Sequence, residues 1–371
     1  MNDSLNQARA CFLEGLAAFQ ADRLPEAARQ FEAALALAPG RPSVLLNLGI
    51  TRLRLGRPDL AVGLLEQATA LEPQDKAAWF HRANAHAMLG QPGPALAAWD
   101  RLLALDPQAT EAWIHRGSLL RETGHLPEAA DSFRRARALG AQGPLLDYYL
   151  AGVGATGEAV PEAAPRDYVA QLFNQYADEF GDHLVQALRY EAPERLVAAL
   201  PAPPAGHWEA ALDLGCGTGL VGALLRPAAQ QLVGLDLAEG MVRRALASGH
   251  YDAVEQADLV PWLAATGQRF DLVVAADVFI YVGALEPVFA GVRRVLVPGG
   301  VLAFSVETPD AAQGGGLVLR PSLRYAHGEA YVRDLAARHG LRVLSAQAGP
   351  LREDQQRPVA GQYWVLQGPS A

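Results

Sequence analysis

The sequence of 371 residues has only two cysteines, Cys11 and Cys216, and a single lysine, Lys76. Only two cysteines suggest no disulfide framework, and nothing in the sequence resembles a metal cluster. No apolar run approaches the roughly 18 residues that a membrane-spanning helix needs. The opening residues MNDSLNQARACFLEG lack the apolar stretch of an export signal. These absences predict a protein of the reducing cytoplasm that holds no metal.

Positive charge is also scarce, since the formal net charge is −9 and basic residues are dispersed. Binding of nucleic acid through its phosphates needs a positive stripe, so nucleic acid is not an expected partner. Half of the residues are hydrophobic and 19% are charged, which is typical of globular chains and not of disordered ones. The length predicts two domains.

The first third of the chain repeats every 34 residues. A small residue, then an alanine, then a bulky apolar residue and finally a proline recur in the same phase. The positions are Gly15, Gly49, Ala83 and Gly117; Ala27, Ala61, Ala95 and Ala129; Phe31, Leu65, Trp99 and Phe133; and Pro39, Pro73 and Pro107. The small residues allow two helices to approach closely, and the proline ends the second helix because it cannot donate a helical hydrogen bond.

This pattern resembles the tetratricopeptide repeat and covers about residues 8–141 in four units. The resemblance implies a superhelix of paired helices whose first helices line a concave wall. Chaperone-tail readers of this family place a Lys and Asn clamp on that wall, and the lysine is missing here. A scaffold that packs on another domain or subunit and a peptide-binding groove both remain open. The expected wall positions are Leu46, Ile50, Phe80, Asn84, Ile114 and Ser118.

Residues 140–168 mix a short apolar piece with Gly, Pro and Ala, which is typical of a domain junction. Residues 145–150 are expected to cap the last repeat, whose outer face otherwise stays open. We therefore predict an all-α repeat domain over residues 1–150, a linker over 151–166 and a second domain over 167–371.

The second domain alternates short apolar runs with amphipathic segments, which predicts a doubly wound α/β domain with a parallel sheet. Seven strands are expected, and the last two are joined without a long helix, which suggests an antiparallel pair. The expected strands are 209–215, 231–236, 253–258, 270–278, 299–307, 341–347 and 361–367. The expected helices are 220–225, 239–248, 286–296 and 327–340.

The stretch LDLGCGTGL, residues 212–220, is open to two interpretations. Gly217, Gly219 and Gly222 spell G-x-G-x-x-G, the dinucleotide-binding pattern. The same loop also matches E/D-x-G-x-G-x-G through Asp213 and the glycines. An acid before the loop suits a ligand with an ammonium group and would repel a pyrophosphate. We therefore favour the second pattern.

That pattern, with VPGG at 297–300, resembles the class I S-adenosylmethionine-dependent methyltransferases over about residues 167–368. More narrowly, the chain looks like bacterial methyltransferases with an N-terminal tetratricopeptide domain. The resemblance implies that S-adenosylmethionine binds the loop and the ends of the next strands. Asp236 would take the ribose, Asp258 the adenine amino group, and Asp277 would shape the methionine end. The implied cofactor-binding residues are Asp213, Gly215, Cys216, Gly217, Asp236, Leu237, Met241, Asp258, Leu259 and Asp277. We expect Cys216 to be a small residue tolerated by the bend.

Motifs that are missing from the sequence exclude some classes of methyl acceptor. Residues 277–281 read DVFIY, so the [DN]-P-P-[YF] pattern of enzymes that methylate adenine or glutamine amides is missing. The glutamate pair of arginine methyltransferases is missing as well. A small molecule, or a protein carboxylate or amine, remains as acceptor.

Two places could supply catalytic groups. His327, in LRYAHGEAY, is either a general base or the polar start of a helix. In residues 172–184, Phe173, Tyr176, Phe180 and Leu184 have helical spacing and form either a buried stripe or a lid over the cofactor. As a lid, this segment would turn Tyr176 and His183 toward the acceptor.

Three functions therefore stay open. The first is methylation of a small molecule, with the repeats used for docking or oligomerisation. The second is methylation of a polypeptide that the repeats recruit. The third is an interaction protein that binds the cofactor without catalysis, which an intact loop and Asp236 disfavour.

Overall fold

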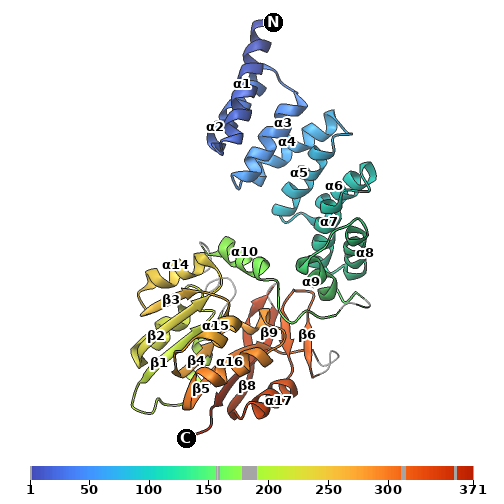
Figure 1. The fold of residues 1–371 in the computed structure, drawn as a ribbon. Coiled ribbons are helices and arrows are strands. Elements are labelled where there is room, and N and C mark those ends of the chain that lie inside the picture. The colour runs from blue at the N-terminus through green and yellow to red at the C-terminus, as the bar shows by residue number, and fades with distance from the viewer. Residues whose placement is uncertain are drawn as a thin grey trace. The chain divides into compact units, whose positions relative to one another are not determined.

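The computed structural model describes residues 2–155, 157, 159–177, 190–310, 315–354 and 357–370. It divides into two compact units, residues 1–155 and 156–371. The first unit is entirely helical, and the second contains a sheet with helices on both faces (Figure 1).

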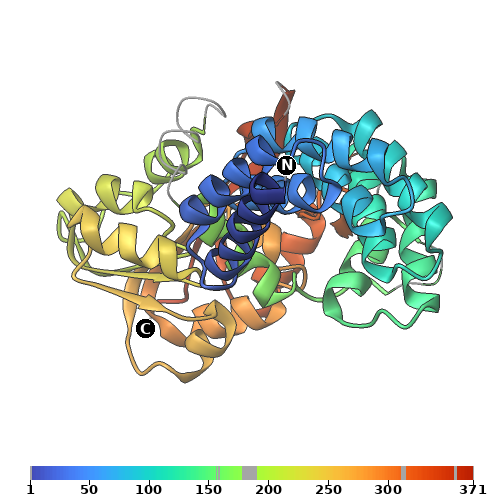
Figure 2. The same ribbon diagram turned by 90° about the horizontal axis from the view of Figure 1, so that it is seen from above.

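Four helical hairpins and a closing helix make up the first unit, and they follow one another along a curved path (Figures 1 and 2). The hairpins pair α1 with α2, α3 with α4, α5 with α6 and α7 with α8. The helices are α1 Asn2–Gln20, α2 Leu24–Leu37, α3 Pro42–Arg54, α4 Pro58–Leu71, α5 Lys76–Met88, α6 Pro92–Leu105, α7 Thr110–Glu122, α8 Leu126–Ala138 and α9 Pro144–Gly152. The four predicted repeats are therefore present, and α9 occupies the expected capping segment.

The 34-residue pattern has a direct steric cause within each hairpin. A Cβ added at Gly15 would lie 2.6 Å from the ring of Phe31, and one at Gly49 would lie 2.7 Å from Leu65. Gly117 and Phe133 repeat the same relationship at 2.7 Å. The small residue of the first helix therefore makes room for the bulky residue of the second.

The sheet of the second unit contains the seven predicted strands in the order β3-β2-β1-β4-β5-β9-β8. All neighbours up to β5 run parallel, whereas β9 is antiparallel to both β5 and β8. The predicted antiparallel pair at the end of the chain is therefore confirmed. The strands are β1 Trp208–Leu214, β2 Ala229–Asp236, β3 Ala253–Gln256, β4 Phe270–Ala275, β5 Leu296–Glu307, β8 Arg342–Asp354 and β9 Arg357–Gln367.

Two further strands were not expected. β6 Leu317–Leu319 and β7 Tyr325–His327 form a short hairpin, and Ala326 pairs with Glu307 at the carboxyl end of β5. The sequence prediction assigned His327 to a helix, but α17 begins only at Glu329. The strands of this hairpin have three residues each, which is too short for a clear period-two pattern.

Helices cover both faces of the sheet. One face packs against a cluster that includes Leu263, Phe289 and Val332, and the other packs against Leu196, Val221 and Leu225. The helices of this unit are α10 Arg166–Tyr176, α12 Ala192–Ala198, α13 Leu220–Leu225, α14 Glu239–Ser248, α15 Leu259–Ala265, α16 Glu286–Val295 and α17 Glu329–Arg338. In a sheet built this way, ligands bind outside the carboxyl ends of the strands.

Within the described ranges, every helix is too short or too polar to cross a lipid bilayer.

Candidate functional site

The glycine loop after β1 has a backbone that side chains would disfavour. Gly215, Gly217 and Gly219 have φ angles of +65°, +55° and +99°, in the left-handed region. A Cβ at Gly215 would also lie 2.4 Å from a methyl carbon of Val278. The loop therefore needs glycine both for its bend and for its close approach to the segment after β4.

The last glycine of G-x-G-x-x-G serves a different purpose. A Cβ at Gly222 would lie 2.4 Å from the ring of Tyr251, and one at Gly234 would lie 3.1 Å from it. Tyr251 thus fills the space that these glycines leave behind the loop. Packing of Tyr251 explains Gly222 without a pyrophosphate.

Asp213 lies in the same buried layer, with 1% of its surface exposed, and it is not part of the cavity wall described below. The Tyr251 hydroxyl donates to its Oδ2 at 2.6 Å, and its Oδ1 has no hydrogen-bond partner. Burial raises the pKa of Asp213 to about 7, against the opposing effect of the Tyr251 hydrogen bond. This corrects the expectation that Asp213 faces the ligand, because it supports the loop from behind.

Asp236 ends β2 and fixes the loop from the other side. Its Oδ2 accepts from the amide of Gly217 at 2.9 Å, and its Oδ1 accepts from the amide of Ala238 at 2.9 Å. Burial raises the pKa of this carboxyl, and the hydrogen bonds from the backbone oppose the rise.

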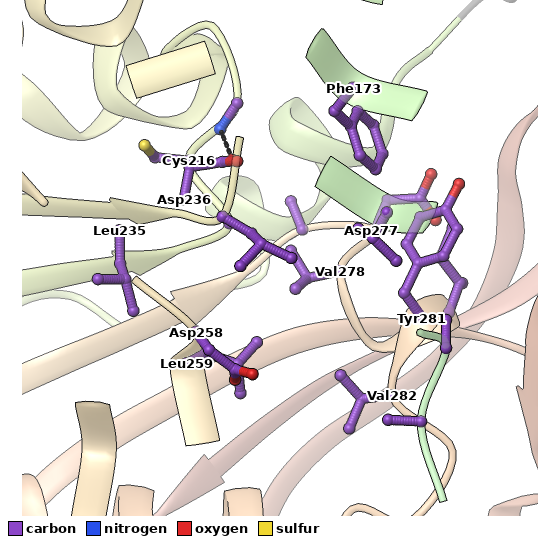
Figure 3. Close-up of a pocket in the computed structure, with 18 of the residues that line it drawn as sticks. Phe173, Cys216, Leu235, Asp236, Asp258, Leu259, Asp277, Val278, Tyr281 and Val282 are labelled. Carbon is purple, nitrogen blue, oxygen red and sulfur yellow. Dashed lines mark hydrogen bonds between the residues drawn. The ribbon is translucent and has the colours of Figure 1, made fainter. Parts of the chain in front are cut away.

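A cavity of about 690 Å³, partly open to solvent, lies in front of this loop, and its volume is within the range typical of small-molecule sites. Gly215, Cys216, Gly217 and Asp236, which are among the residues predicted to bind the cofactor, line this cavity. Leu237, Asp258, Leu259 and Asp277 also line it, from the ends of successive strands. Figure 3 shows Cys216 and Asp236 on one side of the cavity and Asp277 and Tyr281 on the other.

Asp258 is the N-cap residue of the helix α15, which the sequence did not predict. Its Oδ1 accepts from the amide of Val260 at 3.1 Å, and its Oδ2 lies 3.1 Å from Nε of Arg166. With Leu237 and Leu259 beside it, this carboxylate forms a polar edge on an apolar slot. That combination suits a flat heterocycle with an amino group.

The opposite part of the cavity contains a buried ionic cluster. Nη1 of Arg352 donates to both oxygens of Asp277, at 2.7 and 2.6 Å, and Nη2 donates to Glu307. The side chains of Arg352 and Glu307 are 4% and 2% exposed, so these charges are held away from water. Nη1 of Arg320 lies 3.0 Å from the second oxygen of Glu307.

Asp277 is held in an unusual backbone conformation at this point, with φ of +57°. Its amide donates to the hydroxyl of Ser305 at 2.8 Å. The turn ends β4 at Ala275, three residues before the end predicted from sequence. A non-glycine residue with positive φ costs of order 1–3 kcal/mol and is typical of functional sites.

Part of the predicted linker belongs to this site. Glu162, Ala163 and Ala164 line the cavity, and Ala163 forms a β-bridge with Val282. The carbonyl of Glu162 accepts from the amide of Ala284 at 2.7 Å.

The helix α10 covers the same edge of the site. Phe173 lines the cavity and meets the ring of Tyr281 edge-on, with centroids 5.4 Å apart. Oδ1 of Asn174 accepts from the amide of Gly240 at 2.9 Å, which ties α10 to α14. Met241 is fully buried beneath this contact and is not among the lining residues, so its predicted place at the adenine is corrected.

The predicted lid extends beyond the described residues. Phe180, His183 and Leu184 lie outside them, as does the side chain of Tyr176, the last residue of α10. The lid and the role of Tyr176 therefore stay predictions.

His327 lies in β7 with no exposed surface, and it is not among the residues that line the cavity. Its Nε2 donates to the carbonyls of Val282 and Gly283, at 3.0 and 2.9 Å, which assigns the hydrogen to Nε2. Burial lowers the pKa of this imidazole to about 4. The proposed role of His327 as a base is therefore corrected, because the ring is used to hold residues 282–283.

Cys216 was expected to be a small residue that the bend of the loop tolerates, and its surroundings agree with this. Its amide donates to the carbonyl of Leu235 at 2.9 Å, and its side chain is buried. Burial raises the pKa of the thiol, so it stays protonated at neutral pH.

Local sequence patterns did not indicate the lining residues that come from distant segments. Tyr190, Tyr281, Arg324 and Arg352 line the cavity. Arg324, in LRYAH, lies directly before β7, and Arg352, in LRED, lies near the end of β8. An arginine close to a strand end is the sequence signal that could have indicated these two residues. Their convergence is visible only in the fold.

Comparisons with known proteins match both units. Residues 212–302 match the family model of a methyltransferase domain, and residues 18–81 and 89–144 match tetratricopeptide repeat models. The malonyl-[acyl-carrier protein] O-methyltransferase of Enterobacter lignolyticus is 32% identical over 38% of this chain and 55% of its own length. The trans-aconitate 2-methyltransferase of Paracidovorax citrulli is 30% identical over 40% of this chain and 52% of its own length.

The chain thus spans about half the length of these curated relatives. Among solved structures, the magnesium protoporphyrin IX methyltransferase of Synechocystis PCC 6803 is 18% identical, over 55% of this chain and 99% of that one, with a TM-score of 0.43. The family matches thus identify tetratricopeptide repeats in the first unit and a methyltransferase domain in the second.

Proposed function

We propose that this protein transfers a methyl group from S-adenosylmethionine to a small-molecule acceptor. The observation that carries the proposal is the cavity of about 690 Å³ between the glycine loop and the arginine cluster. One end has the bent loop, Asp236 and the apolar slot beside Asp258. The other end, with Phe173, Tyr281 and Arg352, remains for an acceptor.

The residues fit S-adenosylmethionine in three respects. The backbone of the glycine loop is exposed to the cavity at Gly215 and Gly217, and the loop packs closely on Val278, where a Cβ at Gly215 would collide. In the proposed complex, Asp236 would accept from the ribose diol, and Asp258 from the adenine amino group. When bound, the cofactor supplies an activated methyl group on a sulfonium.

An acceptor of low molecular weight is supported by the volume of the cavity and by two relatives. Their names specify malonyl-[acyl-carrier protein] and trans-aconitate as substrates. Methyl transfer from a sulfonium is an in-line displacement, so positioning of the two reactants in one cavity favours it. Within the described wall, no histidine stands ready as a general base.

The test uses the full-length protein with methyl-labelled S-adenosylmethionine and two separate extracts, one of small metabolites and one of protein. Label in the metabolite fraction is the expected result. Label confined to protein would contradict the proposal and favour a polypeptide acceptor. Failure to bind S-adenosylhomocysteine in calorimetry would contradict the cofactor assignment itself.

The repeats are proposed to serve docking or oligomerisation. A chain lacking residues 1–155, the first compact unit, should keep its activity on the small acceptor. If activity on that acceptor is lost while the truncated chain still binds S-adenosylhomocysteine, the repeats have a more direct part in recognition.

A further inference from the structure

The turn that follows β4 packs against the glycine loop in an unfavourable backbone conformation. Asp277 has φ of +57°, in the left-handed region that a residue with a side chain rarely adopts. Val278 follows it, and one of its methyl carbons would lie 2.4 Å from a Cβ at Gly215. Asp277, Val278 and Gly215 all line the cavity. The conformation of Asp277 therefore sets how closely this turn approaches the loop.

Two contacts hold Asp277 in this conformation. Nη1 of Arg352 donates to both of its carboxylate oxygens, at 2.7 and 2.6 Å. The amide of Asp277 donates to the hydroxyl of Ser305 at 2.8 Å. The side chain of Arg352 is 4% exposed, and Ser305 is fully buried. A strained residue persists only where the surrounding structure determines its conformation, and these two contacts do so here.

Arg352 is itself fixed by a second acid. Its Nη2 donates to Oε1 of Glu307, at the carboxyl end of β5, and Nη1 of Arg320 lies 3.0 Å from Oε2 of the same residue. The charges thus alternate from Arg320 through Glu307 and Arg352 to Asp277. A guanidinium that donates to two carboxylates through different nitrogens has little freedom to rotate, because its planar fork fixes both directions.

Stability alone is a weak explanation for this cluster. Moving charges out of water costs free energy that their mutual attraction often fails to offset, so a buried ion pair is poor evidence for a stabilising role. The cluster also lies at the wall of the cavity, where Asp277 and Arg352 are both lining residues. Its direct effect is to fix the position of a strained residue beside the cofactor loop.

We infer that Arg352 is a positioning residue for the methionine part of S-adenosylmethionine, and that it acts through Asp277 and Val278 on the glycine loop. The inference rests on the proposed methyltransferase function, in which the adenine lies beside Asp258 and the methionine part lies between Gly215 and Asp277. Arg352 holds the turn against the loop, so the space for the methionine part has its shape before the cofactor arrives. Without Arg352 the turn relaxes toward an ordinary backbone conformation, and the adenine end is left unchanged.

The test compares two ligands by calorimetry on the full-length protein. S-Adenosylhomocysteine contains the adenosine and the amino-acid part, whereas 5′-methylthioadenosine lacks the amino-acid part. Arg352→Gln should lower the affinity for S-adenosylhomocysteine about 10- to 100-fold, the range expected for the loss of a hydrogen bond to a charged group. The affinity for 5′-methylthioadenosine should stay within about threefold, or well under 1 kcal/mol. Equal losses for the two ligands would indicate a general structural role and overturn the inference, as would unchanged affinity for both.

Arg352→Gln also removes the cation from two buried carboxylates, which destabilises the fold. Two further variants separate the inference from this effect. Arg352→Gln combined with Glu307→Gln removes one charge of each sign, and Ser305→Ala removes only the acceptor of the Asp277 amide. Both should show the same selective loss of S-adenosylhomocysteine, and the loss should be smaller for Ser305→Ala. Arg352→Lys should recover part of the affinity because it keeps the charge without the planar fork. Absence of a selective loss from all of these variants would contradict the inference.

The matched control is Arg342→Gln, at the other end of β8, where the arginine is exposed and donates to the side chain of Gln367. It should change the affinity for neither ligand. A wild-type protein that binds neither ligand would contradict the proposed function itself. Binding of both ligands by the wild type, with equal losses in the Arg352 variants, would leave the proposed function intact and overturn only the positioning role of Arg352.

Discussion

The hydroxyl of Tyr251 donates a hydrogen bond of 2.6 Å to Oδ2 of Asp213, directly behind the glycine loop. The two residues are 38 positions apart and meet because Gly222 and Gly234 leave room for the tyrosine ring. The acid of the loop motif is therefore part of a buried support and does not contact the ligand space. This relationship leads to the first prediction.

The Asp213→Asn variant should become more stable than the wild type as the pH rises. The pKa of Asp213 is about 7 in the folded protein, raised by burial, and the ordinary value of 3.8 applies to the unfolded chain. The stability due to this group is present below about pH 4 and is lost as the pH rises toward 7. Thermal unfolding should therefore show the variant close to wild type near pH 4 and increasingly more stable than wild type as the pH rises to about 7. A stability difference that does not vary with pH would contradict the raised pKa.

Asp236→Ala should weaken S-adenosylmethionine binding by about 1.5–3 kcal/mol, the scale of a lost hydrogen bond to a charged group. Part of the loss would come through the loop, since Asp236 also accepts from the amide of Gly217. Calorimetry with S-adenosylhomocysteine measures the effect. Unchanged affinity, or tight binding of a nicotinamide dinucleotide, would refute the assignment of the loop.

Gly215→Ala should abolish or strongly reduce cofactor binding, because its Cβ would lie 2.4 Å from Val278 and its φ is +65°. Gly249→Ala is the matched control, with φ of +71° and no atom within 4 Å of the added Cβ. Both changes carry a backbone cost of about 1 kcal/mol, but only the first should displace the loop. Equal losses of cofactor affinity would mean that backbone strain alone is responsible.

His327→Ala should lower stability and have little effect on turnover per folded molecule. The change leaves the carbonyls of Val282 and Gly283 without their donor, which typically costs about 1–3 kcal/mol. Denaturant unfolding and single-turnover rates separate the two effects. Normal stability combined with a rate loss of about 10²–10⁴-fold would restore the general-base hypothesis.

The same imidazole predicts an acid-side effect on stability. Its pKa is about 4 in the folded protein, lowered by burial, and 6.5 is the ordinary value. The stability that it contributes is therefore present above about pH 6.5 and is lost as the pH falls toward 4. The His327→Ala variant should lose less stability than wild type over this range.

In the repeats, Gly117→Ala should destabilise the first unit, since the added Cβ would lie 2.7 Å from the buried ring of Phe133. Gly63→Ala, in the interior of α4 with nothing within 4 Å, should raise stability by about 0.5–1 kcal/mol. Thermal unfolding of the two variants tests whether the small positions of the 34-residue pattern are steric requirements. Similar behaviour of both variants would contradict that reading.

Much of this protein follows from local sequence. The 34-residue pattern specifies helical hairpins because each small residue and its bulky partner meet within one repeat, as Gly15 and Phe31 do. The glycine loop is predictable because its left-handed backbone is a property of the residues that form it. Seven of the strands in the described sheet could likewise be predicted from their apolar runs.

Tertiary structure alone decided the rest of the site. Arg352 reaches Asp277 across 75 residues because the β8–β9 hairpin continues past the carboxyl end of β5. Asp213 was expected to face the ligand, but it accepts a hydrogen bond from Tyr251 in the buried layer behind the loop. His327 was considered as a catalytic base, but it donates to the carbonyls of residues 282–283. Local propensity specifies a strand or a turn, but the partner of a buried charge depends on which distant segments pack beside it.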